Sequence, residues 1–92
     1  MEDQLTNARH QINDVDRQIT SLLEKRFKAV QAVNKYKQQH QLPVLDQHRE
    51  EQVLAKVADH VTDSATVLYI QNIFKEIMHQ SRAFQDAQRK EG

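Results

Sequence analysis

Arg26 and Lys37 are the two residues whose type and spacing point most clearly to chemistry. Arg26 interrupts a stripe of apolar residues that has Leu22 before it and Ala29 after it. A charge in such a stripe is costly unless it meets an anion. Lys37 follows eleven residues later, so on one α-helix the two cations point within about 20° of each other and lie about 16 Å apart. This spacing suits a small dicarboxylate that is held at both ends.

Both basic positions have a plainer interpretation. A lone polar residue such as Arg26 in the core of a helical assembly can serve only to set register or oligomeric state. Arg9 lies at the edge of the same stripe, where an arginine can simply extend its charged group into solvent. The residues alone leave these alternatives open.

Two further groups of polar residues could line a site. Near the carboxyl end, Ile77 is followed at helical spacing by Ser81, Gln85 and Gln88; these either mark where a helix leaves the core or supply hydrogen-bond donors. Residues 46–51 form a charged run that opens another expected helix. A cation such as Arg49 in that first turn opposes the helix dipole, which is unfavourable unless a neighbouring acid or a bound anion offsets it.

Three helices must position these side chains. Residues 3–40 contain no glycine or proline, and apolar residues recur every three or four positions, which predicts one helix about 55 Å long. A compact domain of this length has a radius of gyration of about 12 Å, so we expect a second chain to cover part of the rod. Pro43 ends this helix, Asp46 caps a second to about residue 61, and residues 62–64 cap a third that ends near residue 88.

Composition narrows the classes of function. The chain has 92 residues, with 13 basic and 13 acidic side chains and no cysteine. This balance gives no overall field for a nucleic acid or an anionic membrane, and neither partner is expected. The sequence contains neither a signal-peptide pattern nor an apolar run of about 20 residues. We therefore expect one cytoplasmic, all-α domain over residues 1–92.

Metal and cofactor chemistry lack support in the sequence. No two of the five histidines are three or four residues apart, the spacing that would place two ligands on one helical face. The chain also lacks a glycine-rich phosphate loop and a serine in a nucleophile-elbow context. We expect neither a metal nor a cofactor.

Taken together, the motifs resemble a known family. The patterns that carry the resemblance are Arg9-x-x-Ile12-x-x-Val15-Asp16-x-x-Ile19-x-x-Leu22-Leu23-x-x-Arg26, Pro43-Val44-x-Asp46-x-x-Arg49-Glu50-x-x-Val53-Leu54 and Phe74-x-x-Ile77-x-x-x-Ser81-x-x-x-Gln85, with Lys37 between the first two. In this order they closely resemble the all-helical chorismate mutases over roughly residues 5–88. The family's frequent Ile-Asp pair is Ile12-Asn13 here, at an expected exposed position.

The resemblance implies a fold and a reaction. Three helices per chain would interlock with a second chain into an intertwined helical-bundle homodimer with two equivalent sites. Each site would catalyse the Claisen rearrangement of chorismate to prephenate in aromatic amino-acid biosynthesis, without a cofactor. By resemblance, Arg26 and the partner subunit's Arg9 would hold the two carboxylates of chorismate. Helix geometry agrees that Arg9 comes from a partner. On one straight helix Arg9 lies about 42 Å from Lys37 and points about 100° away from Arg26, so one chain cannot bring all three to one small ligand.

The resemblance also implies roles for the remaining residues. Lys37 and Gln85 would donate hydrogen bonds to the ether oxygen, where negative charge grows as the C–O bond breaks. The others would assist: Arg49 with positive potential, Glu50 and the backbone at Asp46 at the ring hydroxyl, and Ser81 at a carboxylate. Because Gln85 is an amide, activity should persist across neutral pH.

Two other functions compete with the mutase. A related isochorismate-pyruvate lyase shares the helical architecture and the carboxylate-binding cations, although Arg49-Glu50 together with Gln85 favour the mutase. A non-catalytic helical dimerisation module would use Arg26 only to set register. Turnover of chorismate against isochorismate separates the two enzymes, and loss of ligand binding in a folded Arg26→Leu variant would argue against the module.

Overall fold

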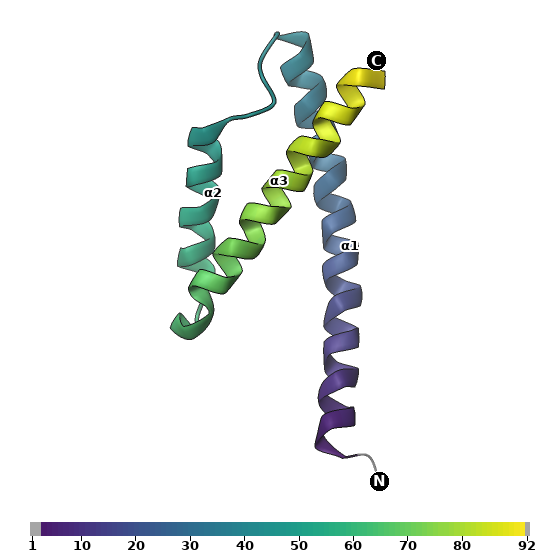
Figure 1. The fold of residues 1–92 in the computed structure, drawn as a ribbon, viewed down its shortest axis with the longest axis vertical. Helices are drawn as coiled ribbons and strands as arrows, with labels where there is room; N and C mark the ends of the chain where they lie inside the picture. The colour runs from purple at the N-terminus through teal and green to yellow at the C-terminus, as the bar shows by residue number, and fades with distance from the viewer. Residues whose placement is uncertain (1–2, 92) are drawn as a thin grey trace.

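The computed structural model describes residues 3–91, and its regular structure is helical throughout. The elements are α1 (Gln4–Gln39), α2 (Gln47–His60), a 3-10 turn η1 (Ser64–Thr66) and α3 (Val67–Glu91). In Figure 1, α3 runs back beside α2 and crosses the carboxyl-terminal half of α1, while the amino-terminal half of α1 projects alone. None of the helices in residues 3–91 is long and apolar enough to cross a membrane.

The long first helix is confirmed. Asp3 caps it, with its side chain accepting a hydrogen bond from the Thr6 backbone N–H at 2.7 Å. The chain measures 58 × 28 × 14 Å, with a radius of gyration of 16.7 Å, well above the value of about 12 Å expected for a compact domain of this size. Helix α1 therefore extends beyond the part that α2 and α3 cover.

A tight turn ends α1. The Leu42 N–H donates to the Lys37 carbonyl at 2.7 Å and the Gln41 N–H donates to the Gln38 carbonyl at 3.2 Å. Gln41 has a φ of 57°, the left-handed conformation that usually calls for glycine in this type of helix end. The turn and Pro43 send the following residues back along the helix, which brings the Val44 carbonyl beside Lys37.

Caps also fix the other two helices. Asp46 is the N-cap of α2, as predicted, and its side chain accepts from the Arg49 backbone N–H at 3.0 Å. The predicted third helix begins instead with η1, because the Asp63 side chain accepts from the Ala65 N–H and its carbonyl accepts from the Thr66 N–H. The α-helix then starts at Val67 and continues to Glu91, three residues beyond the predicted end.

Much of the apolar surface of this chain is uncovered. Along the predicted stripe of α1, Ile12 is 57% exposed and Ile19 is 47% exposed. The apolar residues of α3 differ in burial: Leu68 and Ile73 are exposed, whereas Ile70, Phe74, Ile77 and Phe84 are partly buried. Apolar surface on this scale is typical of an interface, which is the arrangement that the length of α1 predicts.

Candidate active site

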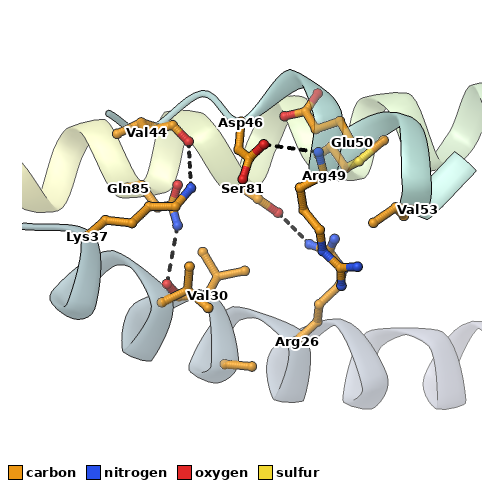
Figure 2. A pocket seen from close by; sticks show the side chains of 13 residues that line it. Arg26, Val30, Lys37, Val44, Asp46, Arg49, Glu50, Val53, Ser81 and Gln85 are labelled. Carbon is orange, nitrogen blue, oxygen red and sulfur yellow. Dashed lines mark hydrogen bonds between the residues drawn. The ribbon is translucent and has the colours of Figure 1, made fainter. Parts of the chain in front are cut away.

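A cavity of about 270 Å³ lies where the three helices and the linker after α1 meet. Its lining residues are Arg26, Ala29, Val30, Val33, Lys37, Val44, Asp46, Arg49, Glu50, Val53, Met78, Ser81 and Gln85. Seven of the eight residues predicted for the site are therefore brought together within one chain. Figure 2 shows Lys37 and Gln85 at one end of the cavity and Arg26 with Arg49 at the other.

Arg26 is held by the polar face of α3. Its Nη1 donates to the Ser81 hydroxyl at 2.7 Å, and that hydroxyl donates to the Ile77 carbonyl at 2.7 Å. Burial lowers the pKa of Arg26 and the adjacent charge of Arg49 lowers it further, whereas Glu50 opposes the shift. Two cations thus share a partly buried space, and an anion bound between them would relieve their repulsion.

Two main-chain carbonyls orient the donors at the other end. The Lys37 ammonium donates to the Val44 carbonyl at 2.9 Å, and the buried Gln85 side chain donates through Nε2 to the Val30 carbonyl at 3.4 Å. An ammonium has three donors and a carboxamide nitrogen has two. Each group therefore keeps at least one N–H for a ligand in the cavity, and the carbonyls fix where those donors lie.

The amino-terminal end of α2 contributes three residues to the lining: the cap Asp46, and Arg49 and Glu50 of the first turn. Asp46 is engaged as the cap, so its side chain faces the Arg49 backbone N–H. The Glu50 carboxylate forms an ion pair with Arg82 of α3. This ion pair ties α2 to α3 at the edge of the cavity.

Two polar residues singled out in the sequence lie away from the cavity. Arg9 is exposed on α1, about 25 Å along the helix axis from Arg26, and is not among the lining residues. Gln88 is also outside the lining; its side-chain oxygen accepts a hydrogen bond from Asn34. In the part of the chain that is described, no three His, Cys, Asp or Glu side chains group as metal ligands would.

Sequence reasoning missed several groups that build the site. Val30 and Val44 act through their main-chain carbonyls, which the identity of a side chain does not reveal. Arg82 follows Ser81 directly, but its pairing with Glu50 depends on how α2 and α3 pack. Asn34 lies off the apolar stripe of α1 in the sequence, yet it is the most buried residue among those described.

Comparison with known proteins identifies the family. A family model described as chorismate mutase type II matches residues 8–86. The chain belongs to the type II chorismate mutases. It is accordingly an isomerase that converts chorismate to prephenate, as the three sequence patterns implied.

Solved structures agree with this membership of the chorismate mutases. A chorismate mutase (form II) from Thermus thermophilus superposes with a TM-score of 0.85 at 27% identity, covering 91% of this chain and 96% of that one. A conserved hypothetical protein from Pyrococcus furiosus superposes with a TM-score of 0.74 at 33% identity, covering 92% of this chain and 99% of that one. No curated protein sequence matches the chain.

Proposed function

We propose that chorismate binds in the cavity between the three helices, with Arg26 and the partner subunit's Arg9 holding its two carboxylates. The observation that carries this proposal is the convergence of Arg26, Lys37 and Gln85 on one cavity. A guanidinium forms two parallel hydrogen bonds with a carboxylate, which fixes direction as well as distance. Two such grips would hold the substrate in the compact conformer that reacts.

Lys37 and Gln85 supply the differential stabilisation. In the rearrangement the ether C–O bond breaks while a C–C bond forms between the side chain and the ring, and no proton leaves or enters the substrate. Negative charge grows on the ether oxygen as the C–O bond lengthens. Donors already oriented by the Val30 and Val44 carbonyls would stabilise that charge without reorganising, an effect typically worth about 3–4 kcal/mol per donor.

The remaining residues would act around this centre. Arg49 adds positive potential close to Arg26, Ser81 assists a carboxylate through its contact with Arg26, and Glu50 with the backbone at Asp46 engages the ring hydroxyl. Glu50 is paired with Arg82, so its carboxylate would accept the hydroxyl hydrogen bond from a fixed position.

The second chain completes the site in this proposal. Arg9 lies too far along α1 to reach its own cavity, and the apolar stripe beside it is exposed at Leu5 and Ile12. An antiparallel copy of α1 would cover the stripe and carry its own Arg9 toward the cavity of the first chain. The assembly would be a homodimer with two equivalent sites.

Mixing two weakly active variants tests this arrangement. Arg9→Ala and Arg26→Ala each remove one charge-assisted contact, and we expect each to lower kcat/KM about 10–100-fold. The two proteins are unfolded, mixed in equal amounts and refolded together. A mixed dimer then contains one cavity with both arginines intact and one with neither, so random pairing restores about a quarter of the wild-type activity.

The opposite outcome is equally clear. If Arg9 serves its own chain, every cavity in the mixture lacks one arginine and activity does not return. Light scattering on each variant checks that both remain dimers. The same preparation is also assayed with isochorismate to test the lyase. Pyruvate release from isochorismate that is faster than prephenate formation from chorismate would overturn the assignment of this cavity to the mutase reaction.

A further inference from the structure

Asn34 is buried at the crossing of α1 and α3. Its side chain is 2% exposed, the lowest value among the described residues. A buried amide is costly unless its donors and acceptor are all satisfied. Asn34 lies outside the apolar stripe of α1 in the sequence, so only the hydrogen bonds that it makes explain why it is buried.

Those bonds all reach the end of α3. Nδ2 donates to the Gln85 main-chain carbonyl at 3.3 Å and to the Gln88 side-chain oxygen at 3.4 Å, while Oδ1 accepts from Arg89 Nε at 2.9 Å. Arginine can only donate, so Oδ1 must face Arg89 and Nδ2 must face the two oxygens. The amide orientation is therefore fixed by chemistry.

This arrangement holds Gln85 at two points. Asn34 binds its main-chain carbonyl, and the Val30 carbonyl, one helical turn earlier on α1, accepts from its side chain. Lys37, the second donor of the cavity, lies one turn further along the same helix. One short stretch of α1 thus fixes the relative position of both donors.

We infer that Asn34 is a positioning residue for the reaction: it anchors α3 at Gln85 so that the Gln85 carboxamide lies where the ether oxygen of the substrate will be. The inference rests on the proposed role of Gln85 as a donor. A displacement of about 1 Å at such a donor can cost as much as 100-fold in rate. The carboxylate grip by Arg26 uses Ser81, one turn earlier on α3, and is less affected.

The test measures kcat and KM separately for Asn34→Ala. We expect kcat to fall about 10–100-fold and KM to change less than about 3-fold, because only binding in the transition state is lost. Asn34→Asp keeps the acceptor for Arg89 and removes both N–H donors, so it should show the same loss of kcat. It also serves as the variant to assay if Asn34→Ala does not fold.

A matched control separates positioning from stability. Gln71 on α3 makes the same kind of bond, from its side-chain Nε2 to the Leu54 carbonyl of α2 at 3.1 Å, and it does not line the cavity. Gln71→Ala should lower the melting temperature with kcat unchanged. If Asn34→Ala behaves in the same way, the inference is wrong.

A double-mutant cycle with Gln85→Ala completes the test. Once Gln85 is removed nothing remains to be positioned, so adding Asn34→Ala should lower kcat no further. A full additional loss of 10-fold or more would overturn the inference. If Gln85→Ala by itself leaves kcat unchanged, then the proposed role of Gln85 fails instead, and the two failures are distinguished.

Discussion

Replacing Lys37 by alanine removes one of the two side-chain donors at one end of the cavity (Figure 2). The ammonium is fixed by the Val44 carbonyl at 2.9 Å, so it is oriented before substrate arrives. Loss of one preorganised donor costs about 2.7–4 kcal/mol, or about 100–1,000-fold in kcat. KM should change little, because in the proposed binding mode Arg26 at the other end of the cavity would still hold a carboxylate.

The same substitution has a structural cost that can be separated from catalysis. The bond to Val44 lies in a partly exposed region, which puts its contribution at about 1 kcal/mol. For a domain of this size that corresponds to a fall in melting temperature of about 4–8 °C. Circular dichroism at 25 °C checks that the variant is folded, and the kcat of a folded variant then reports the chemistry alone.

The assay follows the loss of chorismate absorbance and verifies prephenate by its acid conversion to phenylpyruvate. Lys35→Ala is the matched control, since Lys35 is an exposed lysine on the same helix; its kcat should equal that of the wild type. A folded Lys37→Ala variant whose kcat falls less than about 5-fold would refute the role of Lys37 as a transition-state donor.

Three further predictions concern stability. Gln41→Gly should raise the melting temperature by a few degrees, since relieving a left-handed residue is worth up to about 1 kcal/mol; an unchanged or lower value would show that the turn is not strained. A double-mutant cycle of Arg82→Ala with Glu50→Ala should give a coupling energy of about 1 kcal/mol, and additive losses would mean that the ion pair contributes nothing. Hydrogen bonds from the Thr6 backbone and side chain lower the pKa of Asp3 from its ordinary value of 3.8. The ionised Asp3 cap therefore stabilises the folded chain above pH 3.8, and this stabilisation is lost as the pH falls through the lowered pKa. Asp3→Asn should abolish this part of the acid sensitivity in denaturant titrations, and an identical pH profile in both proteins would contradict the assignment.

Helix positions could be predicted because their signals are local. The apolar spacing of α1, the proline after it and the cap at Asp46 each act within a few residues. The left-handed Gln41 and the 3-10 turn before α3 were not anticipated, since neither has a distinctive residue such as glycine to mark it.

The site was anticipated unevenly. Ser81 and Gln85 stood out because they interrupt an apolar face, and Arg26 because it carries a charge in one. Asn34 and the Arg82–Glu50 ion pair gave no such signal. Their partners lie on other helices, so only the packing of α3 against α1 and α2 reveals what they do.

Steady-state turnover of chorismate by the purified wild-type chain, measured beside Gln85→Ala, decides whether this cavity catalyses the mutase reaction. We expect saturable conversion to prephenate by the wild type, with a rate independent of pH between about 6 and 8 since the amide of Gln85 does not titrate there. In the variant we expect a kcat lower by about 100-fold. A folded wild-type dimer that leaves chorismate unchanged, or a Gln85→Ala variant with full activity, would contradict this proposal.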